Sequence, residues 1–158
     1  MTQTTMPVSE GEHILFLYRR LSRNMLAALR ALSDEELNWR PPTPGGNSRY
    51  VIAYHAATAS EWWLHVALGT IDERDRALEF SARGTFATLE ERFNAGLRAA
   101  EQAIPAVQDY EAVHVLHSGQ WTARYALWHI IEHLSLHLGH IEITSQWYEQ
   151  EQRAESIH

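Results

Sequence analysis

The stretch that most constrains this chain is residues 121–150, which contain no proline and a single glycine and therefore favour one long helix. Four histidines occur in it at spacings of four, four and three: His129, His133, His137 and His140. A helix turns about 100° per residue, so these spacings place all four imidazoles on one side. Apolar residues share that side, and we expect it to face the core of the protein.

A buried row of imidazoles needs partners, because the ring nitrogens lose their contacts with water. A bound metal ion provides several partners at once, and neutral imidazole is the commonest metal ligand. The chain has no cysteine, so such a site must use nitrogen and oxygen ligands. His133 and His137 project side by side at i and i+4. The pair of His129 and His133 has the same spacing, and spacing alone separates neither pair from packed core histidines.

A third candidate ligand lies in a helix that we predict at residues 48–68. His55 is centred on the apolar face of this helix, where an unpartnered imidazole is unfavourable. Three imidazoles and an open coordination position are typical of a reactive metal centre rather than a closed structural one. Glu61 and Glu142 are candidate hydrogen-bond partners for the ligands, although the positions of both residues are also typical of ordinary surface carboxylates.

Residues 129–133 also match the HxxEH pattern of the inverzincin metalloproteases, in which the glutamate acts as a base beside the metal. The corresponding glutamate here is Glu132, about 100° around the helix from His133. Those enzymes are much larger and need a further carboxylate ligand. We therefore do not favour this interpretation.

The remaining sequence predicts an all-α protein. Amphipathic helices are expected at residues 9–32, 48–68, 85–103 and 122–149, the third ending at Pro105. The connections at 69–84 and 104–120 show no convincing strand pattern. Four amphipathic helices without a domain boundary predict a four-helix bundle that spans residues 1–158 as one domain.

The overall charge excludes some classes of function. The formal net charge is −7, and a nucleic-acid-binding protein would need a basic surface for the phosphates. No apolar run reaches the length of a membrane span, and the N-terminus lacks the pattern of a signal peptide. We therefore expect a cytoplasmic protein that binds neither nucleic acid nor membrane.

Three features of the whole chain resemble the DinB/YfiT-like superfamily of metal-binding four-helix bundles. Residues 32–63 are similar to the family's Pro-rich lead-in and its histidine-bearing helix. Residues 133–141, HLSLHLGHI, are similar to its HxxxHxGQ-like signature. The order and length of the predicted helices match as well. Many members have glutamine where this chain has His140, which leaves His140 as an extra ligand or a hydrogen-bonding residue.

The resemblance implies a metal triad of His55, His133 and His137, an up-down-down-up bundle and a homodimer. Three imidazoles suit zinc, nickel, iron or copper, and availability makes zinc the default. The superfamily includes transferases and isomerases that use low-molecular-weight thiols such as bacillithiol or mycothiol. The resemblance therefore implies a small-molecule substrate and a thiol activated at the metal. A metal-dependent hydrolase and a non-catalytic, stress-related dimer that binds metal or a small ligand stay open as alternatives.

Overall fold

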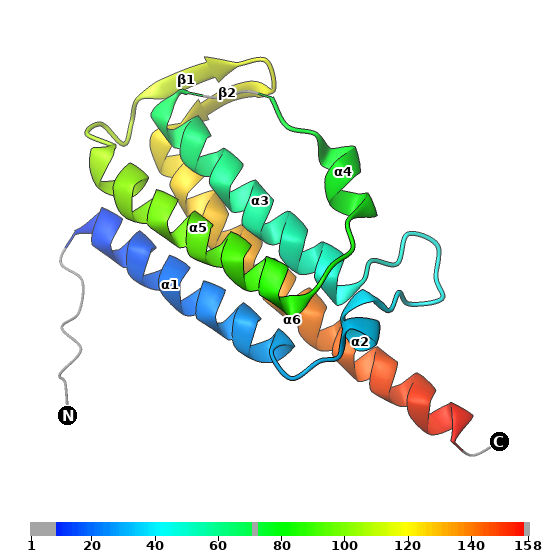
Figure 1. The fold of residues 1–158 in the computed structure, drawn as a ribbon. Helices are drawn as coiled ribbons and strands as arrows, with labels where there is room; N and C mark the ends of the chain where they lie inside the picture. The colour runs from blue at the N-terminus through cyan, green and yellow to red at the C-terminus, as the bar shows by residue number, and fades with distance from the viewer. Residues whose placement is uncertain (1–8, 71–72, 157–158) are drawn as a thin grey trace, which may run out of the picture.

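Four long helices lie side by side in the computed structural model, which describes residues 9–70 and 73–156 (Figure 1). They are α1 (Glu10–Leu29), α3 (Arg49–Leu68), α5 (Phe86–Ala106) and α6 (Ala123–Glu155). The helices α1 and α3 each pack against both α5 and α6. Two short helices, α2 (Asp34–Asn38) and α4 (Arg76–Ser81), lie in the connections on either side of α3. The described chain is mostly helical, as the sequence predicted.

Helix starts coincide with side-chain caps that can be recognised in the sequence. Before α2, the Ser33 hydroxyl accepts from the backbone N–H of Glu36, and the Glu36 carboxylate accepts from the backbone N–H of Ser33. Before α6, the Thr122 hydroxyl accepts from the backbone N–H of Tyr125. These bonds satisfy N–H groups that have no partner inside the helix, and they determine where the long histidine-bearing helix begins.

Three predicted helix ends differ from the structure. The first helix, α1, ends at Leu29 rather than near residue 32. Pro105 does not stop α5, because it lies one residue before the end at Ala106 and disturbs only the last turn. The long helix α6 continues to Glu155 rather than ending near residue 149. Its last residues are mostly Glu, Gln, Arg and Ala, which favour helix even where few neighbours pack against them.

A small antiparallel hairpin corrects the expectation of an irregular segment at 104–120. Its strands are β1 (Val113–Leu116) and β2 (Gly119–Thr122), with His114 opposite Trp121. Val113 and Val115 are exposed, whereas His114 and Leu116 on the other face are partly buried, so the two valines do not mark the inward face of the strand. That exposure explains why hydrophobic patterning did not reveal the strand.

The hairpin closes the end of the bundle where α3 stops (Figure 1). His114 donates from Nε2 to the carbonyl of Ala67, 3.1 Å away, in the last turn of α3. Gly69 then ends the helix in the left-handed conformation, at a φ of 67°. The end of α3 is therefore tied to the hairpin that leads directly into α6.

Small residues allow α3 to lie deep in the bundle. Ala53, Ala56, Ala57 and Ala59 are all buried, in agreement with the close approach of neighbouring helices that α3 makes. Across the described residues, no helix is both long enough and apolar enough to span a membrane. The enclosed position of α3 carries His55 into contact with α6.

Candidate metal centre

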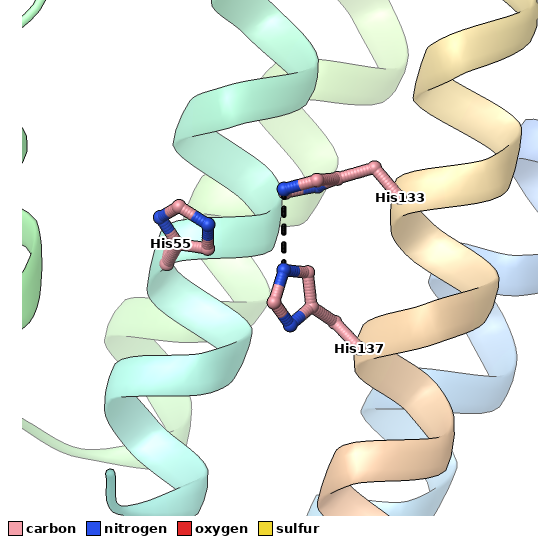
Figure 2. Close-up of side chains that lie close together, drawn as sticks. All are labelled: His55, His133 and His137. Carbon is pink, nitrogen blue, oxygen red and sulfur yellow. Dashed lines mark hydrogen bonds between the residues drawn. The ribbon is translucent and has the colours of Figure 1, made fainter. Parts of the chain in front are cut away.

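Three histidines from two helices converge between α3 and α6 (Figure 2). His55 comes from α3, and His133 and His137 come from successive turns of α6. The ring centroid of His55 lies 5.0 Å from that of His133 and 4.9 Å from that of His137. One nitrogen from each ring lies within 4.8 Å of a nitrogen from each of the others, so the group can hold a metal ion.

The two histidines of α6 face each other through their Nε2 atoms, which are 3.1 Å apart (Figure 2). Burial, reinforced by the neighbouring histidines, lowers the pKa of His133 to about 3 and that of His137 to about 4. Both rings are therefore neutral at pH 7 and offer a lone pair. Two nitrogen atoms in a tetrahedral coordination shell, each about 2.1 Å from the ion, would lie about 3.4 Å apart, which is close to the observed Nε2 separation.

The chemistry of His133 also fits a cation. The buried Nδ1 of His133 has no hydrogen-bond partner among the described residues. If Nε2 of His133 donates to His137, the lone pair on Nδ1 is left unpartnered. If Nδ1 carries the hydrogen instead, the Nε2 lone pair faces the lone pair or hydrogen of His137. A cation held by the facing Nε2 atoms requires the second tautomer, and it would separate lone pairs that otherwise face each other.

His55 is held by charged residues from the connection at 69–84. Its Nδ1 lies 2.7 Å from Oε2 of Glu79. Arg74 donates from Nε to Oε1 and from Nη2 to Oε2 of Glu79, both at 2.6 Å. Burial alone would raise the pKa of Glu79, but the hydrogen bonds from His55 and Arg74 outweigh it and lower the pKa to about 2. Glu79 is therefore a buried, ionised carboxylate at neutral pH.

Sequence reasoning did not find Glu79 as the partner of His55. Of the two carboxylates considered, Glu61 pairs with Arg92 at 2.6 Å and Glu142 is exposed. Glu79 lies on the short helix α4 next to the exposed Leu78, so its surroundings in the sequence resemble a solvated turn. Only the folding of α4 against α3 reveals that Glu79 is buried.

The other two histidines of α6 lie outside the three-histidine group. His140 is exposed rather than turned into the core, although its Nδ1 lies 3.3 Å from Nδ1 of His137. His129 stacks on Tyr125 with ring centroids 5.5 Å apart, and its Nδ1 lies 3.1 Å from Oε2 of Glu132. The convergence with His55 therefore favours the pair of His133 and His137 over that of His129 and His133.

The metalloprotease interpretation of residues 129–133 finds no support in this geometry. The Glu132 side chain is 74% exposed and contacts His129. A base that acts beside a metal would instead have to approach the reacting groups within hydrogen-bond distance. Glu132 is better described as a surface carboxylate.

A pocket of about 310 Å³ opens beside the histidines. Its lining residues are Pro41, Thr43, Gly46, Asn47, Ile52, His55, Phe80, His137, His140, Ile143, Thr144 and Trp147. Among these described residues there is no aspartate, glutamate, lysine or arginine. The pocket is therefore suited to an uncharged molecule with apolar parts, and it gives that molecule access to His55 and His137.

A family model described as mycothiol-S-transferase matches residues 15–149. The matched region includes all three converging histidines, together with Arg74 and Glu79. None of the curated proteins compared with the chain matches it.

Proposed function

Because this chain belongs to the mycothiol-S-transferase family, within the DinB/YfiT-like superfamily, we propose that it is a divalent-metal-dependent thiol S-transferase. The observation that carries the proposal is the convergence of His55, His133 and His137 from two helices. We propose these three residues as the metal ligands. Zinc is the default ion, and nickel, iron and copper also suit three imidazoles.

The proposed metal has a defined chemical role. When bound, a divalent ion supplies positive charge that lowers the pKa of a thiol, so that thiolate is available at neutral pH. The burial that lowers the pKa of His133 and His137 supports this role, because protons then compete little for their lone pairs at pH 7.

The pocket beside the histidines supports an uncharged electrophile as the second substrate. Ile52, Phe80 and Trp147 offer apolar contacts, and Asn47 and Thr43 offer hydrogen bonds. In the proposed reaction the thiolate sulfur bonds to an electrophilic carbon of this acceptor. The leaving group departs with the electron pair of the broken bond, and the thiol proton passes to solvent.

The proposal also covers the organisation of the protein. The course of the helices in Figure 1 supports the up-down-down-up order, because α1 and α6 run toward one end and α3 and α5 toward the other. We propose a single domain over residues 1–158.

Exposed apolar side chains along α6, including Trp128, Leu136 and Ile143, support a homodimer. A reduced thiol substrate is compatible with a cytoplasmic location.

The proposal is tested with untagged protein that is stripped of metal and reloaded with zinc. Metal content is measured by mass spectrometry, and thioether formation is followed with mycothiol and an uncharged haloaromatic electrophile. We expect stoichiometric zinc and thioether product in the wild type, and loss of both in His55→Ala and His133→Ala. The matched control is His13→Ala, because His13 is an exposed histidine whose Nδ1 lies 2.8 Å from the carbonyl of Ser9.

Other outcomes separate the alternatives. Zinc binding without thioether formation from mycothiol or bacillithiol would favour a non-catalytic binding protein. Ester hydrolysis by the zinc-loaded protein in the absence of thiol would favour a metal-dependent hydrolase. A wild-type protein that takes up no metal would contradict both enzyme proposals and leave the histidines as core residues.

A further inference from the structure

We infer that Glu79 is a positioning residue that fixes the tautomer and orientation of His55, and that Arg74 holds the Glu79 carboxylate in place. The inference concerns how this chain prepares one ligand of the proposed site, and it therefore rests on the proposed function. It assigns a role to α4 and to the described residues of the connection at 69–84, of which Phe80 alone lines the pocket.

Hydrogen-bond chemistry determines which nitrogen of His55 is protonated. An ionised carboxylate only accepts, so the 2.7 Å contact with Oε2 of Glu79 requires a hydrogen on Nδ1 of His55. Arg74 Nη2 lies 3.3 Å from the same nitrogen, but it donates to Oε2 of Glu79 over the shorter distance of 2.6 Å. The lone pair of a neutral His55 therefore belongs to Nε2.

The orientation of the ring follows from the same contact. In Figure 2, one ring nitrogen of His55 points toward His133 and His137 and the other points away. With Nδ1 bonded to Glu79, the nitrogen facing the other two histidines is Nε2, the atom that carries the lone pair. The Phe80 ring packs against His55 with centroids 4.9 Å apart and limits rotation of the imidazole. His55 is thus prepared to bind a cation before one arrives.

Arg74 stabilises the buried carboxylate of Glu79. The Glu79 side chain is only 3% exposed, and an isolated ionised carboxylate at such a position would be strongly unfavourable. The two hydrogen bonds from Arg74 neutralise the charge and hold both carboxylate oxygens in a fixed plane. Arg74 therefore positions His55 through Glu79.

The first experiment measures the tautomer directly in metal-free wild-type protein at neutral pH. Long-range proton–nitrogen NMR correlations distinguish a protonated Nδ1 from a protonated Nε2. We expect His55 to carry its hydrogen on Nδ1, and a hydrogen on Nε2 alone would overturn the inference. This measurement needs neither metal nor substrate, so it stands even if the proposed function fails.

The second experiment measures zinc affinity by competition with a chromogenic chelator in full-length variants. Removal of a hydrogen-bond partner of a metal-bound histidine typically weakens metal binding by about 10- to 100-fold, and we expect this loss in Glu79→Ala. Glu79→Gln should lose less, because its amide oxygen still accepts from Nδ1. The matched control is Glu61→Gln. Glu61 lies on α3, the same helix as His55, and its carboxylate pairs with Arg92 of α5.

Circular dichroism of each metal-free variant shows whether it is folded. If Glu79→Ala does not fold, Glu79→Gln and the tautomer measurement decide the question. Zinc affinity within twofold of wild type in folded Glu79→Ala would overturn the inference. Equal losses in Glu79→Gln and Glu61→Gln would also overturn it, because the effect would then be a general loss of charge. If the wild type binds no zinc, the proposed function fails and the tautomer alone tests Glu79.

Discussion

The Nε2 atoms of His133 and His137 lie 3.1 Å apart across one turn of α6, and both rings are neutral at pH 7. Protonating either ring in the folded protein would place a positive charge in a buried site beside other imidazoles. The folded protein therefore favours the neutral form of both rings. This preference links the site to the pH dependence of stability.

We expect the metal-free protein to lose stability as the pH falls from about 7 to about 5. The unfolded chain takes up protons near the ordinary histidine pKa of 6.5, whereas the folded chain resists protonation until about pH 4 at His137 and about pH 3 at His133. Below pH 6.5 the unfolded state therefore binds more protons, and the free energy of unfolding decreases. Urea denaturation at several pH values measures this slope.

The control for this prediction is His133→Gln, which removes one of the two shifted groups. Its stability should change less steeply with pH over the same interval. A wild-type unfolding free energy that stays constant between about pH 7 and about pH 5 would contradict the depressed pKa values of His133 and His137.

Metal binding should reduce the mobility of α4. If Glu79 positions His55 for the ion, the coupling is reciprocal, and zinc must favour the docked position of Glu79 by the same free energy. We expect amide hydrogen exchange in α4 (Arg76–Ser81) to slow on zinc loading. The effect should be smaller in Glu79→Ala, and the amides of α1 provide an internal reference. Equal slowing in α1 and α4 would indicate global stabilisation only.

The converging ligands could be predicted because each has a local signature. His133 and His137 are one turn apart on a helix without proline, and His55 is centred on the apolar face of another helix. Helical periodicity alone therefore predicts that the histidine pair of one helix and His55 of the other face the core. Their meeting at one point depended on the resemblance to a known family, since periodicity does not determine how two helices are aligned.

Glu79 and the hairpin could not be predicted, for related physical reasons. Glu79 lies in a helix too short to have a recognisable apolar face, and its partner His55 is 24 residues away. Val113 and Val115 are exposed while His114 and Leu116 turn inward, so the apolar residues of this strand do not mark its buried face. In both cases the information lies in tertiary contacts rather than in the spacing of neighbouring residues.

Arg49 should contribute to stability. Its buried guanidinium donates from Nε to the carbonyl of Glu36 and from Nη1 to the hydroxyl of Ser145, both at 3.2 Å, and so connects α2 to α6. Arg49→Met leaves these acceptors without their donor, and we expect a loss of about 2–3 kcal/mol in urea denaturation.

The matched control for that change is Arg30→Met. Arg30 pairs with Glu90 at 2.9 Å, but its side chain is 66% exposed. A surface ion pair contributes about 0–1 kcal/mol, so this variant should stay close to wild type. Similar losses in both variants would mean that the contacts of Arg49 contribute no more than an ordinary surface charge.

Two helix-interior glycines should respond in opposite directions to alanine. Apart from its chain neighbours and the adjacent helix backbone, a Cβ at Gly139 of α6 would have no described protein atom within 4 Å, whereas a Cβ at Gly96 of α5 would lie 2.7 Å from Oη of the buried Tyr18. Alanine is about 1 kcal/mol more favourable than glycine in a helix interior, so Gly139→Ala should raise the melting temperature by about 2–4 °C. Gly96→Ala should lower it, because the Tyr18 ring must move within a packed core. Thermal unfolding of the two metal-free variants measures both effects. A lower melting temperature for Gly139→Ala would contradict the open space at this position and would indicate that another molecule, such as a second copy of the chain, packs against α6 there.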